Sequence, residues 1–385
     1  MEYADIVKKL KSLIETETGW KDKFNKAIEA AKRAEIHGWD INSIDDYYKY
    51  INDFLEWAPQ ENTQGDEVMN RLNKFHFVLD QPTVRELQRP IRPRDGIKPE
   101  SKLSDWMVEY ADKLGDFLDE RRSFTTETRK TFENSPNYNL SEYVEPLEGW
   151  KSFNDFFARH VKKGARPIAA PTNENVVVSP ADSTFGGQWE IRADSKITLK
   201  GLHWTVEELL ADSKYASRFT GGTFVHAFLG PLDYHRLHAP VGGKVLEAKV
   251  IPGDVYLEVT IKKAFDREAR EKRNRLNAIR IMDAPEEHFM DAPDSPGYQF
   301  AQARGLIVLE TAVGLVAVLP IGMAQVSSVR LSVAEGDPVK RGGELAYFQF
   351  GGSDIVVLFA ESAINITAKE GVHYKMGTAI AEAHI

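Results

Sequence analysis

Residues 240–255 read PVGGKVLEAKVIPGDV, and this stretch decides the fold class of the chain. A glycine pair precedes a β-branched run and a Pro-Gly-Asp turn follows it, which is typical of a strand that ends in a tight turn. Residues 326–339, VSSVRLSVAEGDPV, repeat this order of run and turn. Each unit predicts a strand, a Gly-Asp turn and a returning strand, so we expect two related hairpin layers that pack together.

Other short β-branched runs, each bounded by Gly, Pro or Asp, extend this pattern through the second half of the chain. They occupy residues 176–178, 223–229, 255–261, 306–309, 315–319 and 355–359. Their spacing predicts a β-rich sandwich or barrel-like domain. Residues 264–301 interrupt the runs and are rich in arginine at first, so we expect an inserted helix and loop over the sheet.

The first half of the chain follows a helical pattern instead. Only 6 of the 27 glycines fall within residues 1–150, and apolar side chains recur at helical spacing over residues 103–118. Ser43 followed by Asp46 resembles a capping box and predicts the start of another helix. Residues 6–34 are a third helical candidate.

Together these patterns predict an α+β chain, with a helical domain over residues 1–149 and a β-rich domain over residues 150–385. Charge follows the same division. Residues 1–150 carry 30 acidic and 22 basic side chains, a net charge of −8 out of −9 for the whole chain. Because this half would be repelled by phosphate backbones, we expect no nucleic-acid partner.

The 385 residues include no cysteine, which excludes disulfides, thiolate metal ligands and a cysteine nucleophile. The first residues lack a basic stretch followed by an apolar core, so we see no secretory signal. The most apolar window, residues 305–326, is broken by Glu310, Gly314 and Pro320 and indicates buried strands rather than a membrane span. These features favour a soluble, cytoplasmic protein.

Gly351-Gly352-Ser353 is the first candidate for chemistry. Two glycines leave the Gly352 carbonyl uncrowded, and a serine hydroxyl can attack that carbonyl if a base removes its proton. Taken alone, the motif is more often a Gly-Gly turn between strands with an exposed serine. It is not the nucleophile elbow of α/β-hydrolases, because Ile355 stands where that motif requires glycine.

His235 and His238 are the second candidates, and they lie three residues apart just before Pro240. On a strand or turn, side chains at this spacing point to roughly opposite faces, so we expect two separate roles and no shared metal. Two structural histidines are the alternative. Asp182 could orient a histidine as the third member of an Asp-His-Ser relay.

Six motifs in order resemble the signature set of the phosphatidylserine decarboxylase family, from about Trp150 to the C-terminus. They are Phe153-Asn154-Asp155-Phe156-Phe157-Ala158-Arg159, Gly164-Ala165-Arg166-Pro167-Ile168, Ser179-Pro180-Ala181-Asp182, Asp233-Tyr234-His235-Arg236-Leu237-His238-Ala239-Pro240, Pro252-Gly253-Asp254 and Gly351-Gly352-Ser353.

The resemblance implies a proenzyme that cuts itself between Gly352 and Ser353. Ser353 Oγ would attack the Gly352 carbonyl, with Asp182 and His238 as the relay that activates it. Elimination and hydrolysis would then convert Ser353 into a pyruvoyl group. The products would be a β chain, residues 1–352, and an α chain, residues 353–385, and each would be a partner of the other.

The resemblance also implies a carboxy-lyase that uses the pyruvoyl group, with neither pyridoxal phosphate nor a metal. The substrate amine would form a Schiff base with the pyruvoyl carbonyl, which then accepts electrons as carbon dioxide leaves. His235 would return a proton to the carbanion, on the argument that imidazole titrates near neutral pH. Replacing His235 should therefore spare cleavage and depress turnover, whereas replacing His238 or Asp182 should leave the chain whole.

Two substrates fit this chemistry. The helical half looks most like the soluble branch of the family typified by L-tryptophan decarboxylase, and its acidity opposes docking on anionic lipid, so a free amino acid is the first choice. The basic stretch at residues 264–276 would suit a membrane-touching lid, which keeps phosphatidylserine, and a peripheral membrane location, as the alternative. A homo-oligomer is compatible with both.

The chain departs from the family pattern in two places. Asp354 follows the serine where the family more often has a small hydroxyl residue, and Ser183 replaces the usual glycine after Asp182. A carboxylate at position 354 could hinder the attacking alkoxide or help to bind a substrate ammonium group.

Two other classes of protein remain as alternatives. A serine hydrolase would use Ser353, His238 and Asp182 in an uncut chain. Residues 335–343 resemble the hairpins of biotinyl- and lipoyl-type binding modules, but those carriers need a lysine at the hairpin tip.

Overall fold

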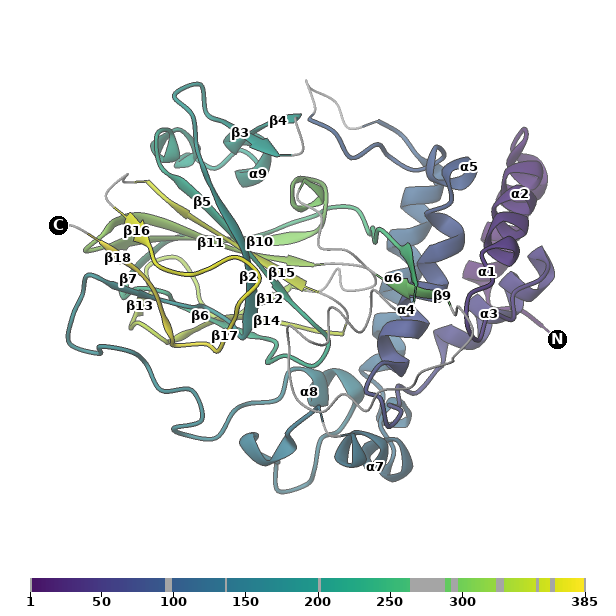
Figure 1. Cartoon of the computed structure of the whole chain (residues 1–385), viewed down its shortest axis with the longest axis horizontal. Helices are drawn as coiled ribbons and strands as arrows, with labels where there is room; N and C mark the ends of the chain where they lie inside the picture. The colour runs from purple at the N-terminus through teal and green to yellow at the C-terminus, as the bar shows by residue number, and fades with distance from the viewer. Residues whose placement is uncertain are drawn as a thin grey trace.

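The computed structural model describes residues 2–93, 99–135, 137–199, 202–263, 288–291, 297–322, 329–350, 353–360 and 364–383. Helices of the first half gather on one side of the molecule and the strands of the second half on the other (Figure 1). This arrangement confirms the predicted α+β class. Within the described residues, no helix has both the length and the apolar character needed to cross a bilayer.

Seven helices form the first half as far as it is described: α1 (Asp5–Thr16), α2 (Trp20–Arg33), α3 (Ile44–Leu55), α4 (Glu67–Leu79), α5 (Pro82–Arg85), α6 (Lys102–Leu118) and α7 (Thr126–Asn134). The predicted helices over residues 103–118 and after Ser43 are confirmed as α6 and α3, and Ser43 caps α3 by accepting from the Asp46 N–H. Residues 6–34 form two helices rather than one. Gly19 separates them with a φ of +78°, a conformation that favours glycine.

Large aromatic side chains fill the space between these helices, and their polar atoms find backbone partners. Trp106 Nε1 of α6 donates to the Ile6 carbonyl at 2.8 Å, and Tyr110 Oη donates to the Ile51 carbonyl at 2.6 Å. Such bonds allow Trp and Tyr to be buried without leaving an unpaired donor. They tie α6 to α1 and α3.

An eight-stranded sheet is the centre of the second half, with the strand order β13-β7-β10-β11-β15-β5-β2-β17. Its strands pair antiparallel, and their bounds are β2 (Ser183–Glu190), β5 (Thr223–Leu229), β7 (Gly243–Ile251), β10 (Arg304–Thr311), β11 (Gly314–Gly322), β13 (Pro338–Val339), β15 (Ser353–Phe359) and β17 (His373–Tyr374).

Smaller sheets and short helices surround it. The further strands are β1 (Val176–Val178), β18 (Ala379–Ala383) and β16 (Ile364–Ile366) in one sheet, β12 (Val329–Leu331), β14 (Glu344–Phe348) and β6 (Arg236–His238) in another, and the pairs β3 (Lys196–Leu199) with β4 (Leu202–Thr205) and β8 (Thr260–Lys263) with β9 (His288–Asp291). The short helices are α8 (Phe153–Phe157), α9 (Val206–Leu210), η1 (Arg121–Ser123), η2 (Leu140–Glu142), η3 (Ala216–Phe219) and η4 (Tyr298–Phe300).

The two Gly-Asp units do not each fold back as the sequence predicts. Over the described residues 252–259 that follow β7 the chain forms no returning strand, and Asp254 makes an isolated bridge to Gln302. In the second unit, β12 pairs with β14 while β13 pairs with β7. The two related segments therefore meet at one edge of the large sheet. Pairing across distant segments replaces the local hairpins because it completes a larger buried sheet.

Most of the predicted insert, residues 264–287 and 292–296, lies outside the described residues, and so does the basic stretch at residues 264–276. Its described parts are the short strand β9 and the 3-10 helix η4. η4 lies in the chain immediately before β10, so this end of the insert leads directly into the sheet.

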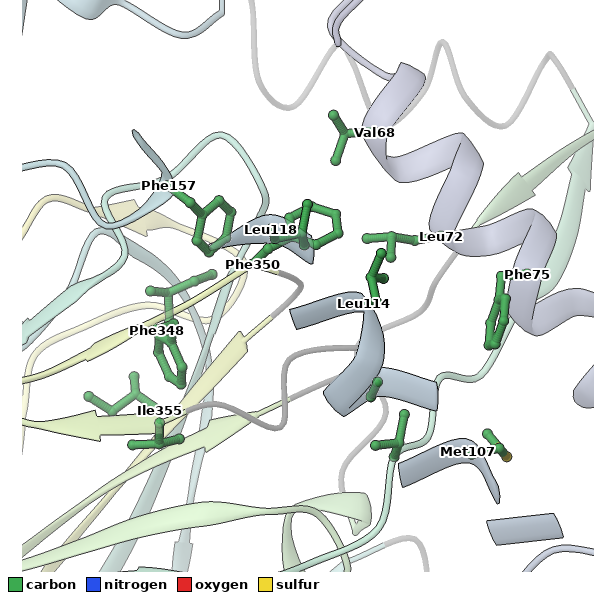
Figure 2. Close-up of a cluster of buried hydrophobic side chains, with 14 of the residues drawn as sticks. Val68, Leu72, Phe75, Met107, Leu114, Leu118, Phe157, Phe348, Phe350 and Ile355 are labelled. Atoms are coloured by element: carbon green, nitrogen blue, oxygen red, sulfur yellow. The ribbon is translucent and has the colours of Figure 1, made fainter. Parts of the chain in front are cut away.

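One hydrophobic core runs from the helices into the sheet. The same cluster of buried residues includes Leu72 of α4, Leu114 of α6, Phe350 and Ile355. Figure 2 shows these side chains, with those of α4 and α6 on one side and those of the sheet region on the other. The helical half thus packs directly against the segment that contains Gly351-Gly352-Ser353.

Candidate active site

Ser353 is the first residue of β15, a strand in the interior of the large sheet. It lies opposite Gly322 of β11 and Leu229 of β5, so neighbours hold it on both sides. The residue is completely buried, and among the described residues its Oγ has no hydrogen-bond partner. A buried hydroxyl without a partner costs free energy in a folded chain. The exposed serine of the alternative interpretation is therefore wrong.

The chain just before the glycine pair is fixed as well. The Phe350 N–H donates to Asn154 Oδ1 at 2.9 Å, and Asn154 Nδ2 donates to Asp119 Oδ1 at 2.9 Å. Phe350 is thus attached to the C-terminal end of α6, while Ser353 is attached to the sheet. Gly351 and Gly352 themselves lie outside the described residues.

His235 lies in apolar surroundings on the side of the sheet that holds α8. Its ring stacks on Phe157, with 3.9 Å between ring centroids and 30° between planes. The imidazole is fully buried, and neither ring nitrogen has a hydrogen-bond partner among the described residues. Burial lowers the pKa of His235 from 6.5 to about 3, and the charge of Arg159 acts in the same direction. The imidazole is therefore neutral.

This finding corrects the physical argument for His235 as a proton donor. An exposed imidazole titrates near neutral pH, but the pKa of this one is lowered because burial disfavours the charged form and Arg159 repels it. To donate a proton to a carbanion, His235 must first become protonated. We expect this when an anionic substrate binds and supplies the hydrogen-bond partner that the ring nitrogens lack.

His238 has a different environment three residues further on. Its Nδ1 lies 2.8 Å from the Gly342 carbonyl, which can only accept, so Nδ1 carries the hydrogen. Nε2 then holds a lone pair and accepts from Tyr234 Oη at 3.1 Å. Burial lowers the pKa of His238, which keeps this neutral tautomer. His238 therefore presents its basic nitrogen at Nε2, the atom that a serine base needs.

Asp182 is paired with an arginine rather than with His238. Arg166 donates to both carboxylate oxygens, with Nε at 2.8 and 2.9 Å and Nη2 at 2.6 Å, and the Met376 N–H donates to Oδ1 at 2.8 Å. The two bonds of His238 go to Gly342 and Tyr234 instead. The geometry of the uncut chain thus differs from the Asp182–His238 contact that the resemblance implies.

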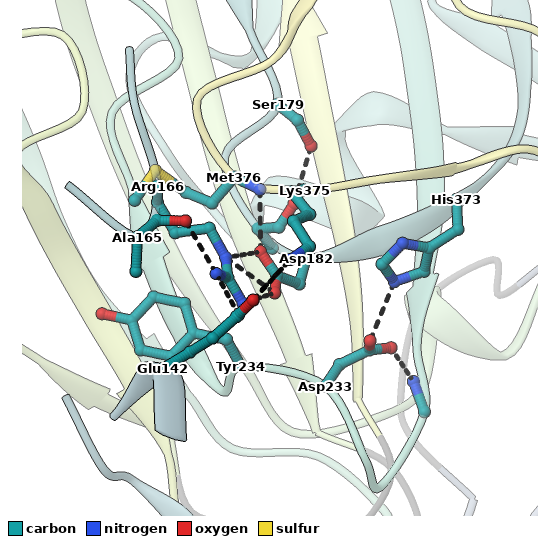
Figure 3. A network of polar contacts seen from close by, with 12 residues as sticks. Glu142, Ala165, Arg166, Ser179, Asp182, Asp233, Tyr234, His373, Lys375 and Met376 are labelled. Atoms are coloured by element: carbon teal, nitrogen blue, oxygen red, sulfur yellow. Dashed lines mark hydrogen bonds and ion pairs between the residues drawn. The ribbon is translucent and has the colours of Figure 1, made fainter. Parts of the chain in front are cut away.

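The Asp182 contacts belong to a larger network that joins residues before and after position 353 (Figure 3). Arg166 Nη1 donates to Glu142 Oε2 at 2.6 Å, and Lys375 Nζ donates to Glu142 Oε1 at 2.9 Å. These interactions lower the pKa of Glu142, although partial burial opposes the shift. Sequence reasoning placed Arg166 in a motif but gave it no role.

Asp354 points to the other side of the sheet and meets two residues that sequence reasoning missed. Its Oδ2 lies 2.9 Å from His226 Nε2 and 3.0 Å from Gln299 Nε2. All three side chains are at most 1% exposed. One signal was available in the sequence, because His226 and Asp354 are polar residues in otherwise apolar strand patterns.

Comparison with known proteins agrees with this site. A family model described as phosphatidylserine decarboxylase matches residues 153–382. The phosphatidylserine decarboxylase proenzyme of Fusobacterium nucleatum is 33% identical over 266 residues, which are 69% of this chain and 75% of that protein. Phosphatidylserine decarboxylase proenzyme 3 of Schizosaccharomyces pombe is 35% identical over 223 residues, or 57% of this chain and 20% of that protein.

Decarboxylase iboD of Amanita muscaria is 30% identical over 285 residues, which are 68% of this chain and 75% of that protein. All of these matches include a decarboxylase in their description, and two are described as proenzymes. The chain belongs to the phosphatidylserine decarboxylase family.

Proposed function

We propose that the chain is a proenzyme that cuts itself between Gly352 and Ser353, and that the processed protein decarboxylates the serine headgroup of phosphatidylserine. One observation carries the proposal: Ser353 has a buried hydroxyl with no hydrogen-bond partner in the part of the chain that the structure describes, at the start of an interior strand, in a chain of this family. The relatives described above that are named for a substrate are named for phosphatidylserine.

Cleavage needs a base for Ser353 and then a series of balanced bond changes. Ser353 Oγ adds to the Gly352 carbonyl as its proton leaves, and the amide C–N bond breaks, giving an ester and a free amine. Loss of the Ser353 Cα proton expels the Gly352 carboxylate. Water then replaces the nitrogen, which leaves as ammonia, and the residue becomes a keto-amide.

We propose His238 as the base, because its hydrogen bonds leave a lone pair on Nε2. Tyr234 Oη now donates to that lone pair, so it must turn away or pass the proton on. Asp182 supports the reaction as an anchor held by Arg166 and as a negative charge that favours a protonated His238.

The fold can survive the cut. The segment after it, residues 353–385, pairs through β15, β17 and β18 with strands that precede it. The Arg166–Asp182 pair adds the Met376 N–H to these contacts. The keto-amide would therefore be the first residue of a strand that the sheet already holds.

The site fits the pyruvoyl group. When formed, this group withdraws electrons from the substrate α-carbon, which is the chemistry that pyridoxal phosphate supplies elsewhere. The residues around it separate two tasks. Phe157 and Phe350 make an apolar wall that weakens solvation of a carboxylate, and His235 lies against Phe157 where it can hold a proton for the α-carbon.

A free amino acid is the second candidate substrate. It is favoured by the net charge of −8 on residues 1–150, which would oppose an anionic bilayer surface. The argument for a tryptophan-like substrate is the resemblance to one branch of the family. No contact described above bears on the oligomeric state.

The intact mass of freshly purified protein tests the first step. We expect two fragments that correspond to residues 1–352 and 353–385, with the smaller one trapped by an amine and borohydride. The Ser353→Ala and His238→Ala variants should give one uncut mass, whereas His235→Ala should give two. A wild-type chain that stays whole and unreactive to carbonyl reagents would refute the proposal.

Carbon dioxide release tests the substrate. Phosphatidylserine vesicles, free serine and free tryptophan are offered to the processed wild type, with Ser353→Ala as the control. Release from vesicles alone supports phosphatidylserine. Release from a free amino acid alone shows that the second candidate is correct.

A further inference from the structure

Asp354 and Ser353 are neighbours on β15 but serve opposite faces of the large sheet. Successive side chains of a strand alternate between faces. Ile355 and Val357 share the face of Ser353 and belong to the core that the helices complete. Val356 and Leu358 share the face of Asp354 and belong to a second, separate core cluster. The start of β15 therefore has one polar side chain on each side.

Neighbouring residues fix the orientation of the Asp354 carboxylate. His226 lies on β5 opposite Val356, which makes it the diagonal neighbour of Asp354 on the same face. Gln299 reaches the carboxylate from η4, and its Oε1 accepts from the Gly297 N–H at 2.6 Å. That bond identifies Nε2 as the atom turned towards Asp354. Both partners bind the same oxygen, Oδ2.

The other oxygen, Oδ1, has no hydrogen-bond partner among the described residues, although Asp354 is completely buried. A buried carboxylate oxygen normally accepts at least one hydrogen bond. Asp182 shows the ordinary situation, since Arg166 or a backbone N–H donates to each of its oxygens. Asp354 thus has one carboxylate oxygen, Oδ2, with hydrogen-bond partners and one, Oδ1, without a partner among the described residues.

The surroundings of this open oxygen suit a cation. Phe228 lies directly opposite Asp354 on β5 and packs against a cluster that includes Tyr298. Within the described residues, Arg and Lys side chains make no ion pair with Asp354, and the ionisable side chain that contacts it is His226. A carboxylate beside aromatic rings is a typical receptor for an ammonium group.

We propose that Asp354 Oδ1 receives the α-ammonium group of the substrate and removes its proton. The inference rests on the proposed function and identifies the group that prepares the amine. A primary amine is mostly protonated at neutral pH and cannot add to a carbonyl in that form. One N–H bond breaks, its proton passes to Oδ1, and the electron pair stays on nitrogen as the uncharged nucleophile.

This proposal gives the two faces of β15 different parts in one reaction. The amine enters from the face of Asp354, where a negative charge is held in place by His226 and Gln299. The carboxylate leaves on the face of His235, where the walls are apolar. The reacting carbon is the Cα of residue 353, a backbone atom of β15, so nitrogen bonded to it can be approached from the face of Asp354.

Amine trapping tests the inference without decarboxylation. Processed wild type and Asp354→Thr, which restores a small hydroxyl residue, are treated at pH 7 with ethylamine plus borohydride, or with methoxyamine. Ethylamine is protonated at this pH and methoxyamine is not. We expect Asp354→Thr to slow trapping by ethylamine about 10- to 100-fold, the lower part of the range for a general base, and to leave methoxyamine labelling unchanged.

Three further measurements separate a chemical role from a structural one. The ethylamine rate of Asp354→Thr should rise about tenfold per pH unit between pH 7 and 9, towards the wild-type rate, because free amine replaces the missing base. Asp354→Asn should resemble Asp354→Thr, since an amide cannot take the proton. Glu310→Thr, which removes an exposed carboxylate from the same sheet, should behave as wild type.

Equal slowing of both reagents in Asp354→Thr would overturn the inference, and so would no slowing of either. If the wild type never cleaves, the proposed function fails, and binding of ethylammonium to the uncut Ser353→Ala chain decides the inference. Ethylammonium binding that NMR detects in Ser353→Ala and that disappears in Ser353→Ala/Asp354→Thr supports the inference. Binding that persists in the double variant contradicts it.

Discussion

Two buried polar regions of this molecule differ in how their hydrogen bonds are satisfied. Around Asp182, each carboxylate oxygen has a donor, and the Arg166 guanidinium contacts two carboxylates. Around Ser353 and His235, the hydroxyl and both ring nitrogens have no partner among the described residues. Satisfied networks hold a fold together, whereas buried groups without partners cost stability and are retained where a reaction uses them.

This comparison predicts that residues of the second region matter for turnover and those of the first for stability. The network around Asp182 also joins segments on both sides of the cut, because Glu142 and Arg166 precede it while Lys375 and Met376 follow it. Substitutions around Asp182 should therefore lower stability and largely spare turnover, and substitutions around Ser353 and His235 should do the reverse. The following changes test that separation.

The largest expected effect is on turnover, from His235→Leu. Loss of a proton donor typically slows a reaction by about 10²–10⁴-fold, so carbon dioxide release per processed site should fall into that range. The free energy of unfolding should change by no more than about 1 kcal/mol, since neither ring nitrogen of His235 has a hydrogen-bond partner among the residues that the structure describes. Turnover close to that of the wild type would show that His235 is a packing residue.

Arg166→Met should have the largest effect on stability. Removing one member of a buried ion pair typically costs about 3–5 kcal/mol, because the partner charge stays buried. Unfolding by urea is measured in a Ser353→Ala background, so that one uncut chain unfolds. Arg122→Met, which removes an exposed arginine paired with Glu56 and Glu120, should cost far less, because water screens an exposed ion pair. Equal losses in the two variants would contradict the comparison.

Tyr234→Phe should have a smaller effect, because it removes one neutral hydrogen bond. The change leaves His238 Nε2 without its donor, which costs about 1–3 kcal/mol for a buried group. Tyr3→Phe serves as the matched control, because the Tyr3 hydroxyl takes part in none of the hydrogen bonds described above. If His238 is the base, cleavage should continue in Tyr234→Phe, and gels of the maturing protein over time would show it.

The smallest effect concerns pH and the pair formed by His373 and Asp233. A hydrogen bond between His373 Nε2 and Asp233 Oδ1, at 2.8 Å, raises the pKa of His373 above 6.5. A raised folded-state pKa gives stability that is complete below pH 6.5 and is lost as pH rises through the folded value. The stability difference between Ser353→Ala and Ser353→Ala/His373→Gln should therefore shrink from pH 6 to pH 9. If the stability difference between the two variants instead grew from pH 6 to pH 9, the pKa of His373 would not be raised in the folded state.

Much of the fold could be predicted from local pattern. Residues 103–118 form a helix because apolar side chains recur at its period, and Ser43 begins one because its hydroxyl caps the Asp46 N–H. Five of the predicted runs appear as parts of β1, β5, β10, β11 and β15. The run over residues 255–261 is strand only at its end, in β8.

The structure differs from the sequence predictions in which strands pair and which side chains meet, rather than in where helices and strands form. The Gly-Asp units were expected to pair within themselves, but β13 pairs with β7 almost a hundred residues away in the chain. In the uncut chain Arg166 holds Asp182, and the role of Asp182 in orienting His238 stays a prediction. Local propensity fixes whether a segment is strand or helix, and it says little about which strand or side chain lies opposite.

The sequence by itself determined the family, the candidate residues Ser353, His235, His238 and Asp182, and the division into helical and β-rich halves. Each of these follows from the order and spacing of residues along the chain. The tertiary structure alone decided that Asp354 meets His226 and Gln299, and that His235 is neutral. Burial and hydrogen-bond partners depend on distant segments meeting in space, and they set the charge and the role of a side chain.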